Sequence, residues 1–211
     1  MIIDPVTLTG RFVRLEPISL DHHAALCEAG LDPELWALSV SRIRTPGEMR
    51  EYIEAALRAQ SEGSALPFAT IEAATSRPIG STRFGSIDRE NRWIEIGWTW
   101  IGRAWQRTPV NTEAKYLMLR HAFETMGCIR VELKTDVLNA RSRAAILRIG
   151  ALEEGILRRH MITASGRVRD TVYYSVIDLE WPSVRAALER RLARRWPPEA
   201  SDAAPGTTPP R

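Results

Sequence analysis

The chain has 211 residues, of which 44% are hydrophobic and 26% charged, with a formal net charge of +3. These ordinary globular values argue against disorder throughout, and the length favours one domain. No apolar run approaches the ~18 residues of a membrane-spanning helix, and the start, MIIDPVTL, lacks the basic region of a signal peptide. Two cysteines, Cys27 and Cys128, are too few for a disulfide framework. We therefore expect a cytoplasmic protein with no membrane partner.

Arginine dominates the basic residues, because Lys115 and Lys134 are the only lysines among 29 lysines and arginines. The densest basic run, residues 185–195, falls on an expected C-terminal helix. A one-sided basic stripe interleaved with aromatic residues would indicate nucleic-acid binding better, and carboxylates elsewhere nearly balance this run. We expect no nucleic acid as a partner, although a ribosome-associated role through this helix stays open.

Apolar–polar alternation and turn residues predict strands and helices in mixed order. The expected strands are residues 8–17, 67–74, 78–87, 93–101 and 129–135, then a hairpin of residues 151–160 and 168–179. The expected helices are residues 20–29 after the cap Ser19, 46–60 after the cap Thr45, 112–126, 139–150 and 180–194. This order predicts a single mixed α/β domain over residues 1–195. The Pro/Ala/Thr-rich residues 196–211 are expected to form a disordered tail.

Residues 93–150 hold the candidate functional motifs. A strand, WIEIGWTWI, enters a short turn, GRAWQRTPVN, and a helix then begins at Thr112. Such a turn aims several backbone N–H groups and the positive end of the helix dipole at one point, which suits a phosphate. Further on, Asn139 and Ser142 form an N-x-x-S pattern at a helix start, where Asn139 can simply cap the helix.

Three stretches carry a family resemblance: EIGWTW, NTEAKYLMLRHAFETMGCIRVELKTDVLNARSRAAILRIGALEEGILRRHM and GRVRDTVYYSVIDLEW. In this order, over about residues 8–192, they resemble the GNAT N-acetyltransferase superfamily, in the branch of the ribosomal-protein N-terminal acetyltransferases. The resemblance implies a single domain with a central, mostly antiparallel, splayed sheet flanked by helices. It also implies acetyl-CoA as the donor, no metal, a primary amine as the acceptor, and a possible homodimer.

The resemblance assigns cofactor-binding residues by position. In the family the fourth strand splays from the fifth and the pantetheine lies in the gap, so the expected contacts are the backbone of Thr99, Trp100 and Ile101, and the side chain of Asn139. The pyrophosphate loop, Q/R-x-x-G-x-G/A, falls on Gln106, Arg107, Thr108, Pro109, Val110 and Asn111, with Thr112 after it. Both loop glycines are replaced. Pro109 has no N–H, whereas Asn111 tolerates a left-handed backbone and carries an amide donor, so we expect side chains to replace some backbone donors.

Acetyl transfer needs a base for the amine and an acid for the leaving thiolate. The tyrosine that the family uses as the acid aligns with Ile146, so Ser142 is the candidate, and its alternative is an ordinary solvated hydroxyl. Glu95, flanked by apolar residues on the splayed strand, is the candidate base, unless it pairs with an arginine or the amine arrives neutral. If the site is degenerate, the chain is instead an acyl-CoA-binding or protein-interaction module.

The family resemblance places the acceptor between the hairpin and the connection of the first two helices. The candidate substrate residues are Trp36 in that connection and Arg158, His160 and Tyr173 on the hairpin. A protein N-terminus and a small-molecule amine both stay open. The lack of an Asp/Glu cluster near residues 35–51 disfavours a polyamine.

Overall fold

The computed structural model describes residue 1 and residues 3–196, so the expected tail lies, apart from Trp196, outside the described residues. One sheet has the strand order β1-β2-β3-β4-β5-β6-β8-β7. The strands are β1 (Leu8–Thr9), β2 (Val13–Pro17), β3 (Leu66–Glu72), β4 (Pro78–Asp88), β5 (Trp93–Ile101), β6 (Arg130–Asp136), β7 (Leu152–Ile162) and β8 (Val168–Ile177). Every neighbouring pair is antiparallel except β5 and β6. The predicted mixed α/β fold with a mostly antiparallel sheet is confirmed; the domain boundary at residue 195 stays a prediction.

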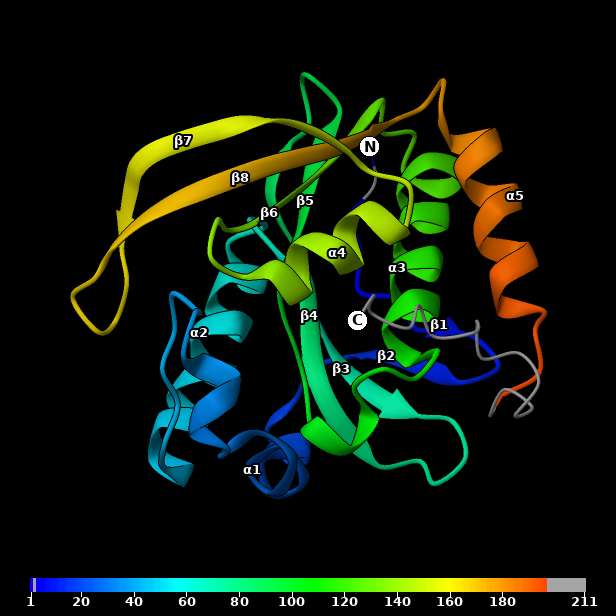
Figure 1. The fold of residues 1–211 in the computed structure, drawn as a ribbon. Helices are drawn as coiled ribbons and strands as arrows, with labels where there is room; N and C mark the ends of the chain where they lie inside the picture. Colours follow the sequence, from blue (N-terminus) through cyan, green and yellow to red (C-terminus); the bar gives the residue numbers. More distant parts are fainter. Residues whose placement is uncertain (2, 197–211) are drawn as a thin grey trace, which may run out of the picture.

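Helices cover both faces of the sheet (Figure 1). On one side, the α2 face, lie α1 (His23–Gly30) and α2 (Pro46–Ser61), which pack around a separate apolar cluster. On the other side, the α3 face, α3 (Val110–Arg120) and α5 (Trp181–Leu192) pack together, and α4 (Ala140–Arg148) buries Ile146 in the same core. The β7–β8 hairpin extends as a long arm past α2 (Figure 1). No helix of the described residues is long and apolar enough to cross a membrane.

The predicted helix starts at Thr45 and Asn139 are confirmed by their caps. Thr45 Oγ1 accepts a hydrogen bond from the backbone N–H of Glu48 (3.1 Å), and Asn139 Oδ1 accepts one from the N–H of Ser142 (3.0 Å). These bonds satisfy N–H groups that have no partner inside the helix. The helix predicted over residues 112–126 begins earlier, at Val110, and its last turn, His121–Thr125, is π-helical.

The strand predicted over residues 8–17 is wrong in one respect, because it is broken into β1 and β2. Three successive N–H groups, those of Arg11, Phe12 and Val13, donate to the Glu113 carboxylate of α3 at 2.9, 2.6 and 2.9 Å. Gly10 permits this approach, since a Cβ there would come within 2.5 Å of that carboxylate. A contact with a distant helix therefore interrupts the local strand pattern.

The alternation of β5 changes phase at Trp98, which has a φ of +50°. Ile96 faces the α3 side, and strict alternation would place Trp100 there as well. Instead Trp100 packs in the cluster on the α2 face. The register shift between Ser81 and Arg83 on β4 marks the bulge responsible. The bulge places the rings of Trp98 and Trp100 on the same side of the sheet.

Candidate functional site

β5 and β6 separate part-way along their length. They pair only at Trp93–Arg130, Ile94–Val131 and Glu95–Glu132, although both strands continue beyond these pairs. The opposite edge of β5 stays paired with β4 as far as Ile101. The edge of β5 that faces β6 therefore has no strand partner over residues 96–101, which include the predicted Thr99, Trp100 and Ile101.

A cavity of about 220 Å³ lies beside this opening. Its lining comes from the α1–α2 connection, α2, β5, β6 and the hairpin. Of the predicted substrate residues, Trp36 lines it, with its indole N–H donating to the carbonyl of Gly30 (2.8 Å). The predicted Arg158, His160 and Tyr173 do not line it. Arg158 and His160 lie exposed on β7, Tyr173 is half-buried on β8, and the hairpin contributes two other residues, Met161 and Arg169.

Glu95 is a buried carboxylate in the wall of this cavity, with 2% of its surface exposed. Its Oε2 forms an ion pair with Lys134 Nζ on β6 (2.8 Å) and accepts a hydrogen bond from Ser86 Oγ (2.9 Å). The partner is thus a lysine of the adjacent strand, not the arginine that sequence reasoning weighed. Oε1 accepts no hydrogen bond from the described residues and lies against Gly97, where a Cβ would come within 2.7 Å. One carboxylate oxygen is therefore held and the other is open to a ligand.

Lys115, which sequence reasoning missed, lies on the opposite face of β5. Its Nζ lies 2.5 Å from Thr99 Oγ1 and 3.1 Å from Thr82 Oγ1, and these two hydroxyl oxygens are 2.7 Å apart. Lys115 has no carboxylate partner among the described residues. Burial lowers the pKa of Lys115 to about 7, because the charged form loses its hydration.

Thr99 connects this buried amine to the cavity, since Thr99 is exposed and lines it. A group with a pKa near 7 can hold or release a proton at neutral pH. The Lys115–Thr99 pair can therefore carry a proton to the cavity wall. The sequence does contain a signal for Lys115: it is one of only two lysines in the chain, and it lies on the apolar face of a predicted helix.

The predicted pyrophosphate loop leads into α3. Pro109 occupies the N-cap position, and its carbonyl accepts the N–H of Glu113 (2.9 Å). The left-handed residue of the loop is Arg107, with a φ of +63°, and not Asn111, which lies inside the helix. Thr108 Oγ1 donates to the carbonyl of Trp105 (2.7 Å), so this hydroxyl is partly engaged.

The loop residues nevertheless fit a phosphate. The first N–H groups of a helix have no intrahelical acceptor, and the helix dipole makes this end positive. Pro109, at the N-cap of α3, has no N–H, so the loop loses one backbone donor there. The exposed guanidinium of Arg107 adds positive charge. The buried Oδ1 of Asn111 has no hydrogen-bond partner among the described residues, but this oxygen is an acceptor and adds no donor for a phosphate.

Asn139 and Ser142 meet at the start of α4, as the motif predicts. The Asn139 side chain caps the helix through Oδ1, so the interpretation of Asn139 as a helix cap is confirmed. Ser142 is half-buried, and its Oγ makes no hydrogen bond with the described residues. Ile146, at the position of the family's tyrosine, is 8% exposed and packs in the core. The described residues hold no cluster of His, Cys, Asp and Glu that could bind a metal.

Comparisons with known proteins show the family to which the chain belongs. The family model of the acetyltransferase (GNAT) domain matches residues 13–152. The chain is 27% identical to the uncharacterized N-acetyltransferase p20 of Bacillus licheniformis over 83% of this chain and 98% of that protein. It is 36% identical to YdaF of Bacillus subtilis, which carries the name of a candidate ribosomal N-acetyltransferase, over 48% of this chain and 55% of YdaF. A crystal structure of a GCN5-related N-acetyltransferase from Brucella melitensis is 32% identical, with a TM-score of 0.84 over 90% of this chain and 86% of that one.

The chain therefore belongs to the GNAT acetyltransferase family and is an acetyltransferase. The resemblance inferred from the sequence is confirmed, including the likeness to a protein named for ribosomal N-acetylation.

Proposed function

We propose that the protein transfers the acetyl group of acetyl-CoA to a primary amine, by direct attack while both substrates are bound. The observation that carries this proposal is the opening between β5 and β6. A cavity lies beside this opening, and α3 and α4 are the helices that follow the two separated strands in the chain. A donor and an acceptor can thus approach the same strand from opposite faces.

Acetyl-CoA supplies the acetyl group as a thioester. The unpaired edge of β5, the α3 N-terminus with Arg107, and the start of α4 with Asn139 are the groups proposed to hold it. We assign the acceptor amine to the cavity, where Glu95 Oε1 is free to take its proton. Ser142 Oγ, at the start of α4, is one candidate donor of a proton to the leaving thiolate, and the Lys115–Thr99 pair, at the wall of the cavity, is another.

The acceptor is a protein N-terminus or a small-molecule amine. The likeness to a protein named for ribosomal N-acetylation supports the first. A polyamine is disfavoured, because Glu95 is the only carboxylate that lines the cavity among the described residues, and Lys134 and Arg169 line it too. A polycation would meet a site that already carries excess positive charge.

The test is calorimetric titration of acetyl-CoA into the wild type, Asn139→Ala and Asn139→Ser. We expect micromolar binding by the wild type and at least a tenfold loss, about 1.4 kcal/mol, in Asn139→Ala. Because Asn139 also caps α4, Asn139→Ser serves as the control: serine restores a capping oxygen but not the amide.

The two variants separate binding from helix stability. A loss in both variants means that the amide contacts the cofactor, whereas recovery in Asn139→Ser means that only the cap matters. No binding by the wild type up to millimolar acetyl-CoA would contradict the proposed function. The chain would then be a degenerate GNAT-like protein-interaction module.

A further inference from the structure

Arg83, on β4, is a buried cation without a counter-ion. Only 7% of its surface is exposed, and its Nε is fully buried with no hydrogen-bond partner. The guanidinium carbon lies 5.2 Å from the ring centre of Tyr52 and 4.9 Å from that of Trp98. No carboxylate or carbonyl of the described residues accepts a hydrogen bond from this guanidinium.

This arrangement is unusual in its energetics. Burying a charge is costly unless it is paired and hydrogen-bonded. Two aromatic rings offset part of that cost through the attraction of a cation to a ring face. They leave the in-plane N–H donors without acceptors, however, and a guanidinium offers those donors in a fixed fork that matches a carboxylate. Arg83 therefore lies between two rings with N–H donors from which an anionic partner can accept hydrogen bonds.

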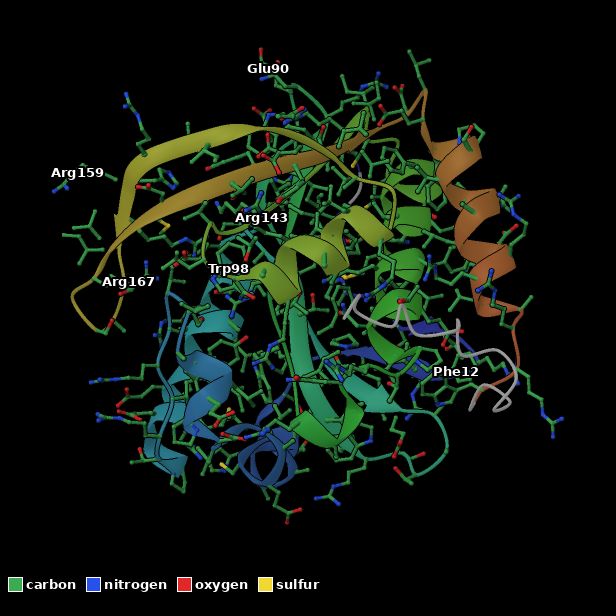
Figure 2. The ribbon with its side chains drawn as sticks, viewed as in Figure 1. Phe12, Glu90, Trp98, Arg143, Arg159 and Arg167 are labelled. Carbon is green, nitrogen blue, oxygen red and sulfur yellow. The ribbon has the colours of Figure 1, made fainter. Side chains whose placement is uncertain are left out.

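The guanidinium lines a second cavity, of about 730 Å³, on the α2 face. This cavity follows β4 and β5 from Trp98 in the middle of the molecule to Glu90 at the turn between the strands (Figure 2). Its other charged lining residues are Asp88, Arg89 and Glu90 near that turn, none of them buried. Hydrogen bonds from Asn91 lower the pKa of Asp88, so Asp88 stays an anion. Arg83 is thus the buried charge of the cavity.

Trp98 is a wall common to this cavity and to the one that holds Glu95. Its ring lies on β4 at Gly85, where a Cβ would come within 2.5 Å of the ring. A molecule whose amine lies beside Glu95 can therefore pass the edge of Trp98 and reach Arg83. Across both cavities the buried or half-buried cations, Lys134, Arg169 and Arg83, outnumber the buried or half-buried carboxylates, Glu95 and Asp88.

We propose that Arg83 binds a carboxylate of the acceptor, so that the substrate is an amine that also carries an acidic group. The proposal rests on the acetyl-transfer function proposed above. The carboxylate has two sources: an acidic side chain near the N-terminus of a peptide, or the carboxyl group of a free amino acid. Both present the same planar anion to the same guanidinium.

The test compares matched probes by calorimetry. One set is pentapeptides with a free N-terminus that differ only by Glu or Gln at position 2, 3 or 4. The other set is free amino acids and their carboxamides. For the peptides with Glu at one of these three positions, or for the free amino acids, we expect the acidic probe to bind the wild type at least tenfold more tightly than the matching neutral probe. In Arg83→Met this preference is expected to fall below twofold, and in Arg83→Lys to fall in between, because lysine keeps the charge but loses the fork.

The matched control is Arg89→Met, which removes an exposed arginine from the same cavity and is expected to retain the preference. The inference is overturned if the wild type distinguishes no pair, if Arg83→Met keeps the preference, or if Arg89→Met loses it equally. The wild-type comparison stands even if Arg83→Met does not fold. Acetyl-CoA binding is measured separately, so acetylation of neutral amines without any acidic preference removes this inference and leaves the proposed function intact.

Discussion

The two lysines of the chain lie on opposite faces of β5 in opposite surroundings. On the α2 face, Lys134 forms an ion pair with Glu95 at 2.8 Å, so the two charges compensate each other. On the α3 face, Lys115 Nζ hydrogen-bonds, among the described residues, only to the hydroxyls of Thr82 and Thr99, and Lys115 is buried. The same side chain is a structural counter-ion in one place and a titratable amine in the other.

This difference shows that the neighbours, rather than the residue type, decide what a buried charge can do. A carboxylate at ion-pair distance stabilises the ammonium, whereas hydroxyl groups and apolar packing do not repay its lost hydration. On the α2 face, Glu95 and Lys134 therefore form a compensated pair in the wall of the cavity beside the β5–β6 opening. The α3 face holds one uncompensated amine that reaches the same cavity through Thr99.

The largest expected effect comes from Glu95→Gln, which tests the chemistry assigned to the α2 face. The amide keeps the shape but cannot take a proton from the amine, so kcat/KM is expected to fall 10²- to 10⁴-fold. Steady-state kinetics over a range of pH measures the change. Glu132→Gln is the control, since Glu132 lies opposite Glu95 in the β5–β6 register but binds Arg130 instead, and little loss is expected. Activity of Glu95→Gln within a few-fold of the wild type at every pH would contradict the base assignment.

The second effect concerns stability on the α3 face. Glu113→Gln places an NH₂ group where a carboxylate oxygen accepts backbone N–H groups, so at least one buried donor loses its partner. We expect a loss of about 2–3 kcal/mol in the free energy of unfolding, measured by urea denaturation. Glu189→Gln removes an exposed carboxylate that binds Arg185 (2.8 Å), and should cost less than about 1 kcal/mol. Equal losses would contradict the expectation that the three backbone hydrogen bonds to Glu113 contribute more to stability than an exposed ion pair.

The pH dependence of Lys115→Met, whose change per pH unit is the smallest of the three effects, is the sharpest test of the comparison. Below pH 7 the lysine is charged in both the folded and the unfolded wild type, and burying the charge costs stability. Above pH 7 the folded chain has lost this proton, because its pKa is lowered to about 7 from 10.5, while the unfolded chain keeps it. Stability of the wild type relative to Lys115→Met should therefore rise with pH, by up to about 1.4 kcal/mol per unit between pH 7 and 9.

Urea unfolding of both proteins at pH 6, 7, 8 and 9 measures this slope. The matched control is Lys134→Met, whose ion pair with Glu95 predicts no such rise over the same range. A constant difference between the wild type and Lys115→Met would mean that Lys115 stays charged in the folded protein. Lys115 would then be a charged ammonium like Lys134, and the two faces of β5 would hold lysines in the same state.

The sequence by itself determined most of the fold and part of the site. Local signals placed β5 at residues 93–101, capped α2 with Thr45, and capped α4 with Asn139, because alternation and capping depend on neighbours in the chain. Ordered motifs identified the family, and with it the strand that opens toward a ligand. The split of the first strand escaped local reasoning, since the acceptor for its N–H groups, Glu113, is about a hundred residues away.

Only the tertiary structure decided which side chains meet at the site. The bulge at Trp98 reverses the faces of β5, and a strand pattern of period two cannot show a reversal that one extra residue produces. The partner of Glu95 lies on a parallel neighbour, and Arg83 comes between Tyr52 and Trp98 from three different elements. Ion pairing and burial depend on distances in space, so the charges of this site are set by the fold and not by the order of residues.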